Sequence, residues 1–299
     1  MSQHLKNIVV GTSLEMASDC VVRTAYEIAR RSGAELHILH AHALPVAYFA
    51  APSGLTTVSA DLLDGEREVR RQLFDQQLER LGLLEAGLRE PVIEAGAAHR
   101  MMLETARSVD ADLVVVGSAE SEGLPLLGST ADRVLRGATC PVWVVEGEPR
   151  MPPRKVLAPV DLSPLSEESL CRGLTLLDEI DDPSPQVECL FVVTRDELEG
   201  SRQFTPDQIR RLAHEELDSF LERVDRDARR RIRPEVREGD IRAEILRDVE
   251  EHPIDLVIVG THGRSGFERF LLGSVAADIA ARARVSVLVI PPDKADTDD

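Results

Sequence analysis

Short runs of Val, Ile and Leu alternate with segments of helical periodicity along the whole chain. In the first half, the strand-like runs are IVVG, LHILHAH, PVIEA, DLVVVG and PVWVV, and helical patterns such as residues 17–31 and HRMMLETARSV lie between them. The second half repeats this order through VLAPVD, CLFVVT, PEVREG, DLVIVG and VSVLVI. Continuous apolar runs between helices are typical of parallel strands buried on both faces. Each half is therefore predicted to be a doubly wound α/β domain with a five-stranded parallel sheet.

Two segments of the first half, a helix and a histidine-containing strand, give further predictions. The helix before PVIEA is predicted to bury one face that carries Val69, Leu73, Phe74, Leu78 and Leu81. In the strand LHILHAH, the first histidine points to one face of the sheet and the other two to the opposite face, so the three cannot join one site. A transition-metal site at the strand end with His99 is an alternative. Satisfied or solvent-facing histidines are the favoured interpretation.

The two halves are copies of one unit. Residues 92–117 resemble residues 236–260, and this alignment pairs Gly96 with Gly239, Asp112 with Asp255, and Gly117 with Gly260. The join falls in EGEPRMPPR, where prolines and charges interrupt the apolar pattern. The predicted domains are residues 1–148 and residues 152–293.

The strand DLVIVG leads into the glycine-containing stretch GTHGRSGFERFLLGS, residues 260–274. Gly260 and Gly263 have no Cβ to keep an anion from the backbone. Gly273 and Ser274 precede the helical pattern SVAADIAARA, for which Ser274 is the predicted N-cap. A helix start offers unpaired N–H groups and a positive dipole end. The combined spacing favours a phosphate site over a turn without a ligand.

The first strand of the second half ends in Pro159-Val160-Asp161. Open parallel sheets bind ligands beyond the carboxyl ends of their strands, where the winding reverses. A carboxylate at such a strand end can accept a hydrogen bond from the exocyclic amine of adenine. The alternative is a loop or helix-capping carboxylate before SPLSEES.

The second half resembles the universal stress protein family, whose ATP-binding members carry G-2x-G-9x-G-[S/T] and whose tandem members join two such domains. The resemblance covers nearly the whole chain and is eroded in the first half. It implies ATP as ligand, with Mg²⁺ or Mn²⁺ as candidate accompanying ions. It implies a nucleotide site made by Pro159, Asp161 at adenine, Val192 as a backbone contact, and Gly260, Gly263, Gly273, Ser274 and Val275 at ribose and phosphates. It also implies association through the last strand of each half, as an intrachain pseudo-dimer or a homodimer.

The first half departs from this pattern. Thr12 or Ser13 stands where the second half has Asp161, and Glu120 replaces the second glycine of the motif, with Glu122 close by. Carboxylates at this place would repel a triphosphate. The first half is therefore predicted not to bind ATP.

Composition narrows the classes of function. A formal net charge of -18 argues against partners such as nucleic acids and anionic membranes. The start MSQHLKNIVVG lacks the features of a signal peptide, so a cytoplasmic location is expected. The leading hypothesis is an ATP-binding stress-response protein that senses or signals. A slow ATPase or phosphotransferase is an alternative, although the chain has no P-loop motif and its glycine stretch has no lysine. A nucleotide-independent scaffold for protein partners is another. No catalytic residue and no metal site is predicted.

Overall fold

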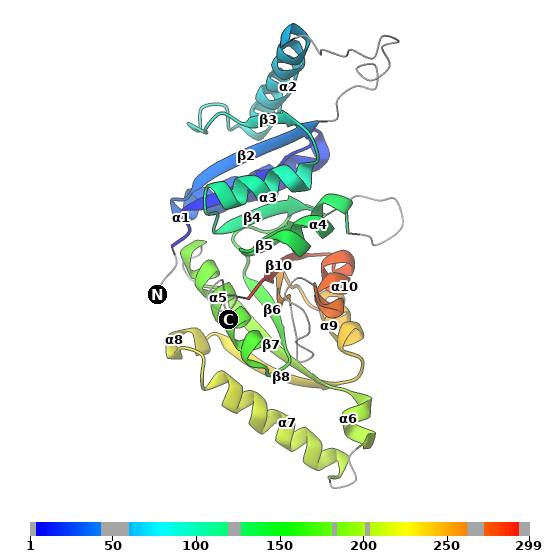
Figure 1. Cartoon of the computed structure of the whole chain (residues 1–299). Helices are drawn as coiled ribbons and strands as arrows, with labels where there is room; N and C mark the ends of the chain where they lie inside the picture. Colours follow the sequence, from blue (N-terminus) through cyan, green and yellow to red (C-terminus); the bar gives the residue numbers. More distant parts are fainter. Residues whose placement is uncertain are drawn as a thin grey trace, which may run out of the picture.

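The computed structural model describes residues 4–42, 60–118, 127–180, 184–200, 204–261 and 272–292. Helices and strands alternate in both halves (Figure 1). The elements of the N-terminal half, residues 1–148, are β1 (Asn7–Gly11), the 3-10 helix η1 (Met16–Ser18), α1 (Asp19–Ser32), β2 (Glu35–His42), α2 (Ala60–Leu81), β3 (Val92–Ala95), α3 (Ala98–Ser108), β4 (Leu113–Gly117), α4 (Ser129–Gly137) and β5 (Val142–Val145). Those of the C-terminal half, residues 152–293, are β6 (Lys155–Val160), α5 (Pro164–Ile180), β7 (Gln186–Val193), α6 (Arg195–Gly200), α7 (Pro206–Leu221), α8 (Arg226–Arg229), β8 (Ile232–Glu238), α9 (Ile241–Glu251), β9 (Leu256–Gly260), α10 (Ser274–Arg282) and β10 (Ser286–Ile290).

All described strands belong to one ten-stranded sheet, in the order β3-β2-β1-β4-β5-β10-β9-β6-β7-β8. Within each half the neighbouring strands are parallel, and each half has five of them. Helices α1, α2, α5 and α7 cover one face of the sheet. Helices α3, α4, α9 and α10 cover the other face. The predicted α/β class with two doubly wound units is confirmed, and the two units share a single sheet.

The halves meet where β5 pairs with β10 in antiparallel register. Trp143 lies opposite Leu288, both side chains are buried, and the backbone N–H of Glu146 donates to Ser286 Oγ at 3.3 Å. The last strands therefore pair within one chain, as expected for a pseudo-dimer. Because this pairing is antiparallel, the strands of the two halves run in opposite directions. The carboxyl ends of the parallel strands consequently point in one direction in the N-terminal half and in the opposite direction in the C-terminal half.

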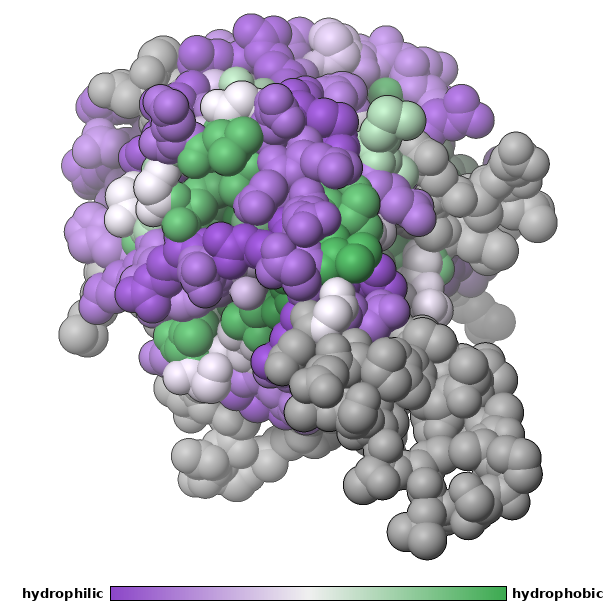
Figure 2. Space-filling view, turned by 90° about the horizontal axis from the view of Figure 1, so that it is seen from above, coloured by the Kyte–Doolittle hydropathy of each residue, from purple (hydrophilic) through white to green (hydrophobic). Residues whose placement is uncertain are grey.

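The outermost strands and helices correct two expectations from the sequence. Strands β3 and β8 form the edges of the sheet and expose several side chains, so they are not buried on both faces. On α2, Phe74 and Leu78 are buried, but Val69 is 50% and Leu73 37% exposed. An α-helix turns by about 100° per residue, so Val69 points roughly 140° and Leu73 roughly 100° away from Phe74. Figure 2 views the molecule from the end at which α2 and β3 lie, and this surface is mainly hydrophilic with separate hydrophobic groups.

Backbone geometry supports the internal repeat residue by residue. Asp112 accepts hydrogen bonds from the N–H groups of the first residue of β1 and the residue before it, and Asp255 does the same at β6. Leu14 has φ 67° and Leu162 has φ 64°, an uncommon conformation for leucine. This match aligns Ser13, the residue before Leu14, with Asp161. The sequence left open whether Thr12 or Ser13 corresponds to Asp161, and this alignment identifies Ser13.

The N-terminal half contains a buried polar network. Gln77 Oε1 accepts from Thr12 Oγ1 at 2.9 Å, and Gln77 Nε2 donates to Ser18 Oγ at 3.2 Å. His40 Nδ1 lies 2.9 Å from the carbonyl oxygen of Thr12, and its ring stacks on His42. These two histidines share a face, as predicted, but both are buried, and His40 Nε2 has no hydrogen-bond partner among the described residues. By strand register, the C-terminal half has Phe191 where this half has His40.

Replacing His40 by Phe should make the free energy of unfolding less sensitive to acid. Burial lowers the pKa of His40 below its usual 6.5; the neighbouring charges of Arg70 and His42 add to this, and the hydrogen bond to Thr12 opposes it. As the pH falls below 6.5, the unfolded chain therefore binds a proton before the folded chain does, and stability is lost until the lower folded pKa is reached. Urea unfolding at pH 7.5 and 5.5 measures this loss.

The matched control for His40→Phe is His214→Phe, because His214 is exposed on α7. We expect the control to lose as much stability between the two pH values as the wild type, and His40→Phe to lose less. An equal loss in all three proteins would contradict the assignment.

Candidate functional site

A cavity of about 340 Å³ opens at the carboxyl ends of the C-terminal strands. It lies where β6 is flanked by β7 on one side and β9 on the other, so the chain winds away from β6 in both directions. This is the switch point of the half, at which doubly wound sheets bind ligands. The wall opposite the strand ends comes from α9 and from the start of α10.

The cavity brings together residues that are far apart in the sequence. Of the predicted site residues, those that line it are Pro159, Asp161, Val192, Gly260, Gly273, Ser274 and Val275. Gly263 lies outside the described residues. The predicted adenine end and the predicted phosphate end therefore face one common space.

Asp161 is held at the cavity by the turn that follows β6. Its Oδ1 accepts from the backbone N–H of Ser163 at 3.0 Å, and its own N–H donates to Ser166 Oγ at 3.2 Å. The positive φ of Leu162 allows the chain to turn sharply at this point. The aspartate therefore stabilises its own loop while presenting a carboxylate to the cavity.

The start of α10 forms the other end of the cavity and corrects one prediction. The N-cap is Gly273, whose N–H donates to the carbonyl oxygen of Thr261 at 2.7 Å, and Ser274 is the first helical residue. Among the described residues no side chain caps this helix, and its first turn carries no acidic residue. The N–H groups of the first helical residues have no partner within the helix. Together with the positive end of the dipole, they make this end of the cavity suitable for an anion.

Several lining residues were not predicted from the sequence. Glu197, on α6, accepts from the N–H of Thr194 at 2.8 Å and from its hydroxyl at 3.0 Å, and both residues line the cavity beyond β7. Ile241 and Ile245 on α9 supply an apolar wall. The sequence did carry a signal for the start of the helix that bears these isoleucines. Asp240 is the N-cap of α9 and accepts from the N–H of Ala243 at 3.0 Å.

The N-terminal half has a smaller hollow, of about 270 Å³, at the equivalent position. Ser13 lines it in place of Asp161, and the lining residues that the structure describes include no ionisable side chain. The first turn of α4 contains Asp132, whereas the first turn of α10 has no acidic residue. Glu120 and Glu122 lie outside the described residues. Asp132 is paired with Arg136 on the same helix. The difference between the two hollows therefore lies in the carboxylate, which this half lacks at the predicted adenine end.

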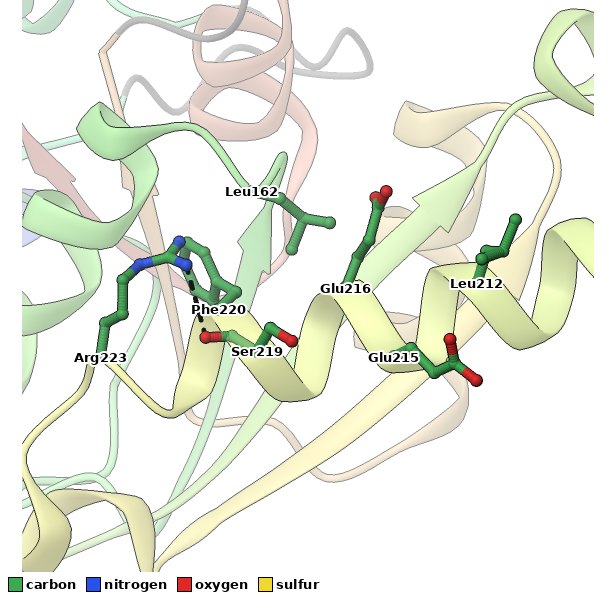
Figure 3. A pocket seen from close by; sticks show the side chains of 7 residues that line it. All are labelled: Leu162, Leu212, Glu215, Glu216, Ser219, Phe220 and Arg223. Carbon is green, nitrogen blue, oxygen red and sulfur yellow. Dashed lines mark hydrogen bonds between the residues drawn. The ribbon is translucent and has the colours of Figure 1, made fainter.

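A third hollow, of about 370 Å³, runs along α7 (Figure 3). Its lining residues are Leu162, Leu212, Glu215, Glu216, Ser219, Phe220 and Arg223. The guanidinium of Arg223 lies 5.3 Å from the ring centre of Phe220 and forms an ion pair with Glu167 on α5. Since this groove shares no lining residue with the switch-point cavity, we assign it no part in ligand binding there.

Within the described ranges, no helix is long and apolar enough to cross a membrane. No group of three or more His, Cys, Asp or Glu side chains in the same ranges could hold a metal ion.

The fold and the cavity define a class: a duplicated, doubly wound α/β protein with a ligand cavity at the switch point of its second unit. The profile of the Universal stress protein family matches residues 4–146 and 153–291. The chain therefore belongs to the universal stress protein family, as the sequence motif predicted, and it is of the tandem type.

Relatives support this assignment over the full length. The chain is 29% identical to a universal stress protein of Mycolicibacterium smegmatis over 311 residues, which cover 95% of this chain and 97% of the relative. It is 31% identical to a universal stress protein of Methanocaldococcus jannaschii over 145 residues, covering 47% of this chain and 84% of the relative. A solved universal stress protein of Archaeoglobus fulgidus has the same fold, with a TM-score of 0.65, 17% identity, and coverage of 95% of this chain and 98% of that one.

Proposed function

We propose that the chain is an ATP-binding stress-response protein that acts as a sensor or signalling protein, with ATP bound in the C-terminal half only. One observation carries the proposal: seven residues from separate segments, predicted from the glycine motif and the family resemblance, line a single cavity at the switch point. Asp161 would accept from the adenine amine and the backbone at Val192 would contact the base. The glycines and the start of α10 would hold ribose and phosphates, with Mg²⁺ or Mn²⁺ as accompanying ion.

The chemistry of the lining supports this ligand. Apolar side chains such as Ile241, Ile245 and Val259 can enclose a flat base, and a carboxylate stands at one end. The uncapped start of α10 stands at the other end, where Gly273 brings no side chain between the helix and a phosphate. The cavity thus offers an apolar middle, an acceptor for an amine and donors for an anion.

The described lining supports a binder over an enzyme. Its ionisable side chains are Asp161 and Glu197, and each already accepts a hydrogen bond from a backbone N–H of its own loop. Phosphoryl transfer also requires a residue that orients the nucleophile, and we assign this role to neither carboxylate. We therefore expect bound ATP to remain uncleaved for hours, and a slow ATPase stays the alternative. Chromatography of nucleotide extracted from the protein after incubation distinguishes the two.

Titration calorimetry of the full chain with ATP should give about one site per chain. The reason lies in the N-terminal hollow, which has Ser13 in place of Asp161 at the adenine end and no ionisable side chain in its described lining. It therefore lacks the charged acceptor that we propose for the adenine amine. Two ATP molecules per chain would contradict binding in one half. No heat and no rise in melting temperature with ATP would favour the scaffold alternative.

A further inference from the structure

Arg242 lies beside the proposed phosphate end of the cavity. It is the second residue of α9, and its Nη2 donates to Ser274 Oγ at 2.7 Å. Ser274 lines the cavity and is the first residue of α10. The hydrogen bond therefore holds a guanidinium next to the uncapped helix start.

The charge of Arg242 is not neutralised by a carboxylate in the described part of the chain. Its neighbours in sequence differ: Arg237 pairs with Glu188 and Asp248, and Arg247 pairs with Glu244. Arg242 is half-buried, lies beside the cavity and has no ion pair with a described residue, so we expect its charge to be available to an anionic ligand.

This cation meets an electrostatic need of the site. The chain carries a net charge of -18, and Asp161 and Glu197 both line the cavity. A nucleotide polyphosphate would be repelled by these charges, and a helix dipole supplies only about half an elementary charge. An arginine adds a full positive charge and a planar fork that can bind two phosphate oxygens at once.

We propose that Arg242 determines the specificity of the C-terminal cavity for nucleotides with a polyphosphate chain over uncharged nucleosides; this inference rests on the ATP site proposed above. The Ser274 hydroxyl accepts from Arg242, so its own hydrogen is directed elsewhere and can be donated to a phosphate oxygen. Arginine and serine together bind the anion, while adenine is held at the far end of the cavity.

The N-terminal half supports this assignment by contrast. Gly96 and Gly239 have the same unusual backbone conformation, with φ 156° and 147°, and fix the alignment of α3 with α9. This alignment places His99 where α9 has Arg242. The half that we propose not to bind ATP therefore also lacks the arginine.

The test uses the full chain with Arg242→Gln and Arg242→Met, titrated with ATP and with adenosine. We expect the affinity for ATP to fall by about 10- to 100-fold, the range for losing a hydrogen bond to a charged group. We expect the affinity for adenosine to stay within about twofold, because the base end is unchanged. Arg247→Gln is the matched control, since Arg247 lies on the same helix and pairs with Glu244. It should leave both affinities unchanged.

Each outcome has a defined meaning. A wild-type protein that binds neither ATP nor adenosine would overturn the proposed function itself. Wild-type binding of ATP with no loss in either Arg242 variant would overturn only the role of Arg242. An equal loss of affinity for ATP and for adenosine would show that Arg242 supports the fold of the cavity. That result would also overturn its role in specificity. Melting temperatures without ligand distinguish this last case, because a selective loss for ATP leaves them unchanged.

Discussion

A fragment of residues 152–299 should associate through β10 into dimers or larger aggregates, or become insoluble. In the full chain all five residues of β10 are buried, and β5 supplies the hydrogen-bonding partner along one side of this strand. Without the N-terminal half, β10 becomes an open, apolar edge that pairs readily with another copy. Size-exclusion chromatography with light scattering measures the result.

The control for this fragment is the missing half itself. Co-expressed residues 1–148 should restore a soluble one-to-one complex, because β5 can again pair with β10 and α1 can again pack against α5. The N–H of Leu5 also donates to Glu179 on α5 at 2.5 Å, which adds a polar contact between the halves. A monodisperse, monomeric fragment with normal ATP affinity would contradict the role of β5 as an edge cover.

Asp161→Ser should reduce the affinity for ATP by about 10- to 100-fold, which corresponds to about 1.5–3 kcal/mol for a hydrogen bond to a charged group. Serine is the residue at the same position in the N-terminal half. There the Ser13 hydroxyl accepts from the N–H of Glu15 at 3.4 Å, as the Asp161 carboxylate accepts from Ser163. The turn after β6 should therefore survive the change, and only the charged acceptor for the adenine amine is lost.

Calorimetry with ATP measures the affinity of Asp161→Ser, and the melting temperature without ligand tests the fold. Asp207→Ser is the matched control, because Asp207 is exposed at the start of α7 and away from the cavity. The control should bind ATP like the wild type. Unchanged affinity in Asp161→Ser would show that adenine is held in another way.

The elements that could be predicted are those whose apolar pattern is strong. Buried strands such as β4, β5, β9 and β10 are continuous apolar runs, and the motif with its spacing led to residues 260 and 273–275. The pairing of Asp161 with Gly273 across more than a hundred positions followed from the strand order that the resemblance implied. The sheet order in the structure agrees with it.

The errors and omissions have physical causes. The exposure of Val69 and Leu73 depends on where α2 lies relative to the edge strand, which local periodicity cannot give. Ser274 looked like an N-cap, but Gly273 takes that position and the serine hydroxyl accepts from an arginine of another helix. Glu197 on α6 follows β7, whereas Arg242 and the isoleucines lie on α9, which follows β8. Asp240 marks the start of α9, but none of these residues belongs to a ligand-binding motif, so only the fold shows that they approach the site.

Because β5 pairs with β10 in antiparallel register, the carboxyl ends of the strands in the two halves point in opposite directions. After duplication of an ancestral unit, this arrangement would have separated two kinds of selection. Substitutions around the N-terminal hollow could accumulate without touching a nucleotide held by the other copy. The paired strands could not drift in this way, because each protects the other from aggregation. Under the proposed function, the N-terminal copy would then be maintained by its part in the shared sheet.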